Sequence, residues 1–150
     1  MVLLFMLIAT LATQDDAGIP QAEKEQESAT FRKINMLLAT EHVSNVDALA
    51  LSKDIDNHVA EEDKDDIIAM AWQETRFLHR AIGSQGERGI LQVHPLYHPE
   101  YDRDSLMTMP YGLKAGYEVY VIKFNRDQKR YSGSSAYPES IKRIKGKMGI

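Results

Sequence analysis

The chain has 150 residues, 43% of them hydrophobic and 27% charged, a composition typical of a folded globular domain rather than a disordered protein. This length suffices for one domain and is too short for two. The absence of cysteine excludes disulfide scaffolds, cysteine-ligated zinc, iron–sulfur clusters and thiol catalysis. The net charge of −4 gives no electrostatic reason for nucleic-acid binding, so we expect no nucleic-acid partner.

Charge is distributed unevenly along the chain. Residues 15–66 contain 14 acidic and 5 basic side chains, whereas residues 123–150 contain 8 basic and 2 acidic ones. Two interpretations are open. The basic segment binds an anionic polymer, or its charges are solvated and complemented by acids elsewhere in the fold.

Residues 1–13 form an apolar segment that is too short to cross a bilayer as a helix. Its length suits the hydrophobic core of a signal peptide, although no lysine or arginine precedes it. We therefore expect export to the periplasm or cell envelope. A short membrane anchor and a buried N-terminal helix are the alternatives. Residues 14–30 are polar and are interpreted as a linker or a loosely held polar helix.

Beyond residue 30, apolar residues recur at spacings of three and four, which predicts a mainly helical domain over residues 31–150. We expect helices near residues 31–38, 46–59, 63–78, 112–124 and 138–145. Residues 90–93 are short and β-prone, and prolines mark the long connection after them. The expected fold class is mainly α (α+β), with a small irregular or β element near residues 84–94.

The helix expected over residues 63–78 carries a carboxyl group among apolar side chains. The stripe consists of Ile67, Ala71, Glu74 and Leu78. Apolar surroundings remove solvation from Glu74 and raise its pKa, and an acid that stays protonated near neutral pH can act as a general acid. The alternative is an edge position at which Glu74 forms an ion pair. The basic residues near it in sequence are Lys64, Arg76 and Arg80.

A glycine-rich segment follows Glu74. Gly86 and Gly89, three residues apart, permit a tight turn and a close approach of the backbone to a ligand. Such a turn directs Ser84 and Gln92 back toward the end of the helix that carries Glu74. A hydroxyl and an amide beside a protonated acid suit a sugar, because sugars offer hydroxyl and acetamido groups.

Three blocks of the sequence resemble the soluble lytic transglycosylase family. Residues 74–77 (Glu-Thr-Arg-Phe) and 84–92 (Ser-Gln-Gly-Glu-Arg-Gly-Ile-Leu-Gln) resemble its Glu-Ser-x-Phe and Gly-Leu-Met-Gln motifs, with the same separation between Glu and Gln. Residues 110–116 resemble its Asn-Ile-x-x-Gly helix, and residues 130–134 its Ala-Tyr-Asn-x-Gly turn. The resemblance covers roughly residues 46 to 146. The departures from the usual Ser, Met and Asn are Thr75, Leu91 and Ser132.

This resemblance implies a lysozyme-like fold and a carbon–oxygen lyase that acts on the glycan strand of peptidoglycan. Glu74 is implied to protonate the oxygen between N-acetylmuramic acid and N-acetylglucosamine. With assistance from the substrate's acetamido group, Glu74 then takes a proton from the muramic acid C6 hydroxyl, which attacks to give a 1,6-anhydro product without water. Ser84, Gln92 and Tyr131 are implied to bind the substrate.

Structural roles are the alternatives for these three residues: turn capping for Ser84, backbone hydrogen bonding for Gln92 and core packing for Tyr131. Two other functions are also open. A goose-type-like muramidase hydrolyses the same bond, and glycosidases that use water commonly have a second carboxylate. No second carboxylate stands out in a matching motif. Glu87, Asp102 and Asp104 lie in loops, but Glu87 occupies a variable motif position, where we expect it to face solvent. The third possibility is a catalytically silent glycan-binding component of a phage or secretion assembly.

We expect no metal and no cofactor. His94 and His98 have a spacing that can bind a metal on a helix, but Pro95 and Pro99 interrupt this stretch. Tyr97 and Tyr101 are candidates to line a glycan groove. The expected partners are the peptidoglycan strand and proteins of a phage particle or secretion machine, with membrane association through residues 1–13. The location is the cell envelope, or the virion for a phage protein.

Overall fold

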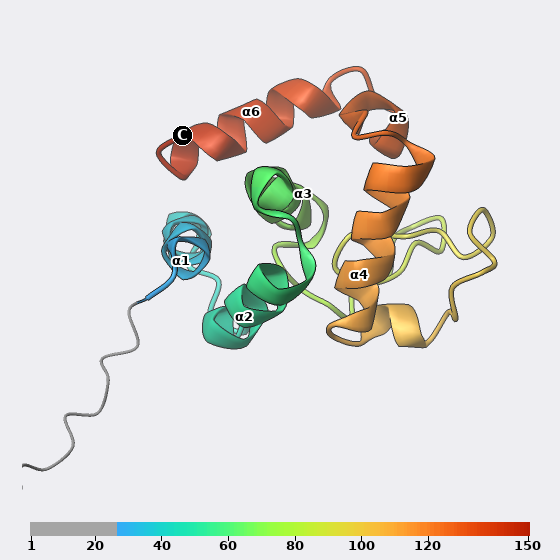
Figure 1. The fold of residues 1–150 in the computed structure, drawn as a ribbon, viewed down its shortest axis with the longest axis horizontal. Helices are drawn as coiled ribbons and strands as arrows, with labels where there is room; N and C mark the ends of the chain where they lie inside the picture. Colours follow the sequence, from blue (N-terminus) through green and yellow to red (C-terminus); the bar gives the residue numbers. More distant parts are fainter. Residues whose placement is uncertain (1–26) are drawn as a thin grey trace, which may run out of the picture.

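A computed structural model describes residues 27–150 (Figure 1). The signal-like segment 1–13 and the polar linker up to residue 26 lie outside the described residues. Within residues 27–150, no helix combines the length and the apolar character needed to span a membrane.

The described part of the chain is mainly helical and contains no β-strand, which confirms the mainly α prediction. In chain order its elements are α1 (Ala29–Glu41), α2 (Ala48–His58), the 3₁₀ turn η1 (Glu61–Asp63), α3 (Lys64–Thr75), the 3₁₀ turn η2 (Ser105–Met107), α4 (Tyr111–Glu118), the π-helix η3 (Val119–Lys123), α5 (Gln128–Ser132) and α6 (Tyr137–Lys147). Ser28 caps α1 by accepting a hydrogen bond from the Phe31 backbone at 3.1 Å. The first helix therefore begins within the segment interpreted as a linker.

Helix α3 lies at the centre of the molecule, with α1 and α2 on one side, α4 on the other and α6 packed along it (Figure 1). Its residues 67–72 are at most 1% exposed, as expected for a helix enclosed on every side. Arg76 and Phe77 have φ angles of 54° and 67°, which end the helix at Thr75. The prediction that the helix reaches Leu78 is wrong, and Leu78 is 46% exposed. Leu78 therefore does not belong to the apolar stripe around Glu74, which within α3 consists of Ile67 and Ala71.

Residues 84–94 form an irregular loop. The expected β element is reduced to two isolated bridges, which pair Ile82 with Arg88 and Arg88 with Val93. Gly86 and Gly89 have φ angles of 98° and 77°, so the tight turns predicted for these glycines are confirmed.

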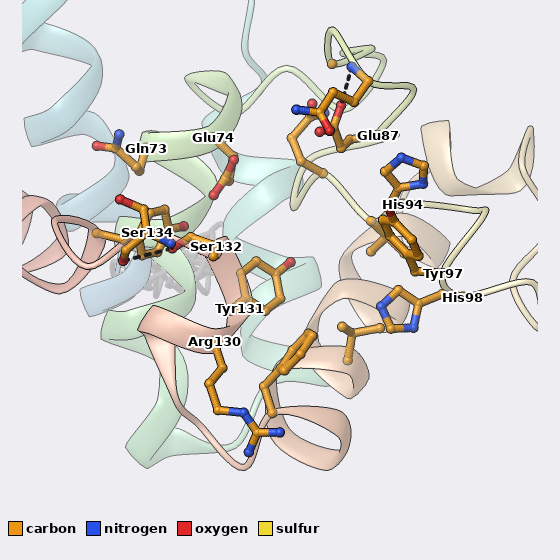
Figure 2. A pocket seen from close by; sticks show the side chains of 18 of the residues that line it. Gln73, Glu74, Glu87, His94, Tyr97, His98, Arg130, Tyr131, Ser132 and Ser134 are labelled. Atoms are coloured by element: carbon orange, nitrogen blue, oxygen red, sulfur yellow. Dashed lines mark hydrogen bonds between the residues drawn. The ribbon is translucent and has the colours of Figure 1, made fainter.

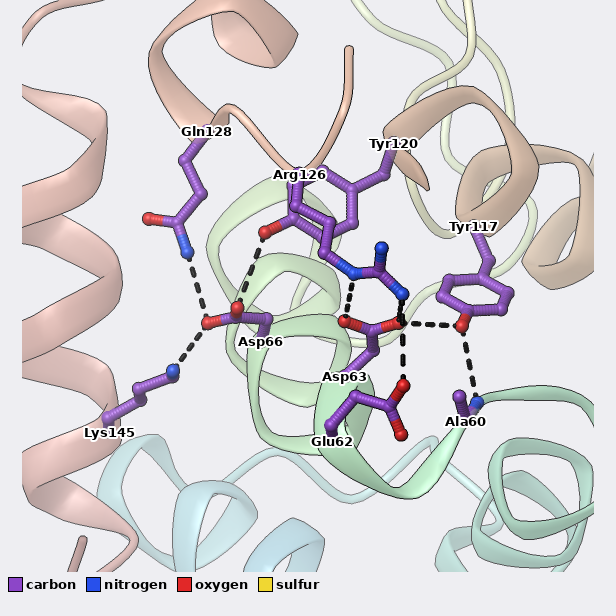
Figure 3. A network of polar contacts seen from close by, with 9 residues as sticks. All are labelled: Ala60, Glu62, Asp63, Asp66, Tyr117, Tyr120, Arg126, Gln128 and Lys145. Carbon is purple, nitrogen blue, oxygen red and sulfur yellow. Dashed lines mark hydrogen bonds and ion pairs between the residues drawn. The ribbon is translucent and has the colours of Figure 1, made fainter. Parts of the chain in front are cut away.

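Ion pairs between the two halves of the chain explain much of the uneven charge distribution. Arg126 binds Asp63 and Lys145 binds Asp66 (Figure 3). In addition, Lys147 lies 3.9 Å from Glu41. These contacts support the interpretation that acids elsewhere in the fold complement the basic segment.

Candidate active site

A pocket of ≈ 820 Å³ opens beside the C-terminal end of α3 (Figure 2). Its walls come from α3, the loop over residues 83–98, η3, α5 and the start of α6. The four residues singled out from the sequence all line it: Glu74, Ser84, Gln92 and Tyr131. The fold thus brings them together, while their roles in binding and catalysis stay predictions.

Glu74 occupies the last turn of α3, with its carboxyl group in the pocket. Burial raises its pKa above the ordinary value of 4.5, and the negative charge of Glu87 raises the pKa further, whereas the Tyr137 hydroxyl lowers it. The C-terminal end of a helix also carries partial negative charge, which disfavours a carboxylate there. The protonated form of Glu74 is therefore favoured to a higher pH than in a solvated glutamate.

No basic side chain among residues 27–150 forms an ion pair with Glu74. Arg76 instead binds Glu41, with 2.7 Å between Nε and Oε2, and its guanidinium lies 5.0 Å from the centre of the Trp72 ring. Lys64 binds Asp56 at 2.9 Å and a second acid on the preceding turn. The alternative of an ion-paired edge position is therefore wrong.

Gln92 has a φ angle of 49° and uses its side-chain nitrogen to hold the loop. Nε2 donates to the carbonyl oxygen of Gly89 at 2.8 Å and to that of Ala81 at 3.3 Å. The side chain of Gln92 thus forms the backbone hydrogen bonds that were the structural alternative to substrate binding. Its amide oxygen remains available as an acceptor in the pocket. Ser84 is exposed, and its hydroxyl makes no hydrogen bond with the described residues.

Tyr131 combines a position in the pocket wall with a role in packing. Its hydroxyl donates to the Leu91 carbonyl oxygen at 2.5 Å, and its ring meets those of Tyr120 and Phe124 edge to face at 5.8 Å. Burial raises the pKa of Tyr131 well above its ordinary value, and the charge of Glu74 adds to this effect. The phenol therefore stays protonated, with its proton engaged by the backbone.

The three blocks of the family resemblance converge on residues 90–92. The Thr75 hydroxyl donates to the Ile90 carbonyl oxygen at 3.1 Å, and Tyr131 donates to the next carbonyl along. Gly116 of α4 lies so close to the Leu91 side chain that a Cβ there would collide with it. These contacts fix the glycine-rich loop against the end of α3.

Several pocket residues were missed or misjudged in the sequence. Glu87 is partly buried and lines the pocket opposite Glu74, so the expectation that it faces solvent is wrong (Figure 2). Its Oε2 accepts a hydrogen bond from the Gln85 backbone at 3.0 Å. His94 and Tyr97 form a wall with ring centroids 4.5 Å apart, and Tyr97 is 71% exposed. Of the two groove candidates identified in the sequence, Tyr97 lines the pocket and Tyr101 does not.

Nothing in the sequence identified Tyr137. The apolar spacing of α6 indicates a core position for it, and Tyr137 is indeed only 7% exposed. It nevertheless lines the pocket beside Glu74. Only the tertiary contact between α3 and α6 reveals this arrangement.

Within residues 27–150, no three His, Asp or Glu side chains gather as a potential metal site. The chain matches no protein-family model, no curated protein and no solved structure in the comparisons made. A functional assignment therefore depends on the geometry of the pocket and on the sequence motifs.

Proposed function

We propose that this protein is a lytic transglycosylase of lysozyme-like fold that cleaves the glycan strand of peptidoglycan. The observation that carries the proposal is the Glu74 carboxyl group, which is partly buried in a pocket of ≈ 820 Å³ and has no ion-pair partner among residues 27–150. Pockets of this size can enclose several sugar-sized groups. The alternation of polar and aromatic side chains in its wall suits a polysaccharide.

In the proposed reaction, protonated Glu74 gives its proton to the oxygen that links N-acetylmuramic acid to N-acetylglucosamine. The bond from this oxygen to the muramic acid C1 breaks, and the acetamido oxygen of the same sugar stabilises C1. Glu74, now a carboxylate, takes the proton of the C6 hydroxyl. The C6 oxygen attacks C1 and closes a 1,6-anhydro ring, which returns the proton to Glu74 and consumes no water.

The substrate-binding roles proposed for Ser84, Gln92 and Tyr131 have different structural support. Ser84 offers a free hydroxyl at the rim and Gln92 offers its amide oxygen, because its nitrogen holds the loop. The hydroxyl of Tyr131 is engaged by Leu91, so its contribution is the ring surface. We propose Tyr97 as an additional sugar contact, since an exposed ring in the wall can stack on a sugar.

The test is product analysis on purified peptidoglycan by mass spectrometry. Wild-type protein is expected to release 1,6-anhydro ends, and Glu74→Gln is expected to bind glycan and release none. Binding without turnover by both proteins would leave a glycan-binding component of a phage or secretion assembly. Undiminished turnover by Glu74→Gln would exclude Glu74 as the acid.

Hydrolysis of the same bond is the second candidate, and the position of Glu87 favours it. A second carboxylate across a pocket can activate water, as in many glycosidases. The product would then carry a reducing end, one water heavier than the anhydro end. Glu87→Gln should abolish turnover by a hydrolase and leave a transglycosylase active, so this variant separates the two mechanisms.

A substrate in the cell wall also implies where the protein acts. We propose a location in the periplasm or cell envelope, or on a virion, with the apolar segment 1–13 serving export or membrane association. Proteins of a secretion machine or a phage particle are the corresponding partners. Fractionation of cells that produce the full chain tests this part of the proposal.

A further inference from the structure

Tyr137, the first residue of α6, carries a hydroxyl group that the fold does not use. The residue is 7% exposed, and its Oη has no hydrogen-bond partner among the described residues. Leaving a buried polar group unpaired costs about 1–3 kcal/mol, so such a group calls for an explanation. The hydroxyl lies in the wall of the pocket, beside Glu74.

Three titratable side chains from three different elements interact with Glu74. Tyr137 from α6 and Glu87 from the loop after α3 shift the pKa of Glu74, and the charge of Glu74 raises the pKa of Tyr131 from α5. The Tyr131 hydroxyl already donates to a backbone carbonyl at 2.5 Å. Glu87 contributes negative charge, and no basic side chain among residues 27–150 forms an ion pair with Glu74. Tyr137 is therefore the one of the three with a donor left for the Glu74 carboxyl group.

We infer that Tyr137 is a positioning residue for the acid: its hydroxyl donates a hydrogen bond to the Glu74 carboxylate once Glu74 has released its proton to the substrate. This inference rests on the proposed function. No covalent bond forms or breaks at Tyr137, and the phenol keeps its proton throughout. In the structure both groups line the pocket and no hydrogen bond joins them. The negative charge that follows proton release attracts the hydroxyl.

Electrostatics agree with this geometry. Burial raises the pKa of Tyr137 far above its ordinary value, and the neighbouring Glu74 raises it further, so Tyr137 can donate a proton in a hydrogen bond but cannot act as a base. Conversely, the Tyr137 hydroxyl lowers the pKa of Glu74 against the larger effect of burial. Burial thus favours the protonated form of Glu74 at rest, and the Tyr137 hydroxyl limits the cost of ionising it.

The test combines an NMR titration with kinetics. The side-chain carboxyl carbon of Glu74 is followed against pH in the wild type and in Tyr137→Phe, with its signal assigned by its absence from Glu74→Gln. We expect Tyr137→Phe to move the Glu74 midpoint to higher pH. Turnover on peptidoglycan should fall about tenfold at an unchanged KM, as expected for the loss of one hydrogen bond to a charged group. In the pH profile of turnover by Tyr137→Phe, the loss of activity on the basic side should move to higher pH.

Tyr117→Phe is the matched control. It removes a hydroxyl that donates to Asp63 at 2.7 Å, at the far end of the same helix, and it should leave the Glu74 midpoint and turnover unchanged. Should Tyr137→Phe fail to fold, 3-fluorotyrosine at position 137 replaces it. The more acidic phenol of 3-fluorotyrosine is a stronger donor, so the midpoint should then move to lower pH.

An unshifted Glu74 midpoint in Tyr137→Phe overturns the inference. A raised KM with an unshifted pH profile also overturns it, because Tyr137 would then contact the substrate instead. The titration needs no turnover, so its outcome is independent of the proposed function. If the wild type cleaves no peptidoglycan, the proposed function fails while the titration still decides whether Tyr137 contacts Glu74.

Discussion

The two ends of helix α3 shift the pKa of a carboxyl group in opposite directions. At the N-terminal end, Asp63 is 2% exposed and lies within reach of two hydrogen bonds from Arg126, at 2.7 and 2.8 Å, and of one from Tyr117 (Figure 3). Arg126 and Tyr117 hold the pKa of Asp63 below its ordinary value, against the effect of burial. At the C-terminal end, Glu74 has no ion-pair partner among the described residues, and burial raises its pKa.

The position of each carboxylate along α3 contributes to this difference. The N-terminal end of a helix favours negative charge and the C-terminal end disfavours it. Asp63 and Asp66 use the favourable end to connect α3 with the chain segments that follow η3 and with α6. Glu74 sits at the unfavourable end, where its ionised form is destabilised, as expected for a general acid but not for a structural carboxylate.

Replacing Glu74 with glutamine should give the largest effect. Turnover is expected to fall by about 10²- to 10⁴-fold, the usual contribution of a general acid. The free energy of unfolding at neutral pH should stay the same or increase, because the substitution removes a buried carboxylate that lacks a counter-charge. Urea denaturation and product analysis on the same preparation measure both quantities. A less stable Glu74→Gln protein would contradict the comparison between the two ends of α3.

Replacing Asp63 with asparagine should have the opposite effect. It keeps the side-chain shape but removes the charge that binds Arg126, and we expect the free energy of unfolding to fall by about 2–3 kcal/mol. Arg126 is 44% exposed, so water can partly replace the lost partner, which keeps the loss below that of a fully buried pair.

Asp65→Asn is the matched control for this substitution. Asp65 lies at the same end of α3 and binds Lys33, with both side chains partly exposed to solvent. Exposed ion pairs contribute little, so the expected loss is below about 0.5 kcal/mol. Equal losses in Asp63→Asn and Asp65→Asn would show that burial does not distinguish the two sites.

The sequence predicted α1 to α4 and α6, and the grouping of Glu74 with Ser84, Gln92 and Tyr131, because these depend on local spacing and on motifs. It missed the short α5, where only a turn was expected. It placed the end of α3 three residues too late. Leu78 fits the apolar period, but Arg76 and Phe77 adopt left-handed backbone conformations that propensity does not predict. Gly86 and Gly89 were read correctly, since glycine marks such conformations directly.

The part of the site that the sequence did not predict depends on contacts between residues far apart in the chain. Tyr137 and Glu87 reach Glu74 from α6 and from the loop, and no spacing in the sequence specifies either contact. The same holds for Asp63 and Arg126, which are 63 residues apart in the chain. Asp63 was predicted only as a helix-start residue, and its burial depends on how the later segments fold back.

The pH dependence of stability should separate the two carboxylates. The pKa of Glu74 is higher in the folded than in the unfolded state, so its effect on the free energy of unfolding grows unfavourable as pH rises above its ordinary value of 4.5. Asp63 has the opposite shift: its contribution is present above its ordinary value of 3.8 and is lost as pH falls through the folded pKa.

Denaturation curves from about pH 3 to about pH 8 test both signs. The stability advantage of Glu74→Gln over the wild type should increase as pH rises, by about 1.4 kcal/mol for each unit that separates the folded and unfolded pKa values of Glu74. The deficit of Asp63→Asn should shrink as pH falls. Parallel curves for the three proteins would mean that neither carboxylate titrates differently on folding.

The smallest expected effect concerns how the pocket end of α3 is held in place. The Thr75 hydroxyl donates to the Ile90 carbonyl oxygen at 3.1 Å, and valine has the same shape without the donor. We expect Thr75→Val to lower the free energy of unfolding by about 1 kcal/mol. It should also reduce turnover, because residues 90–92 include Gln92 itself and the Leu91 carbonyl oxygen that holds Tyr131. Thr75→Ser keeps the donor and should restore turnover. If serine and valine behave alike at position 75, packing of the loop rather than this hydrogen bond positions the pocket end of the helix.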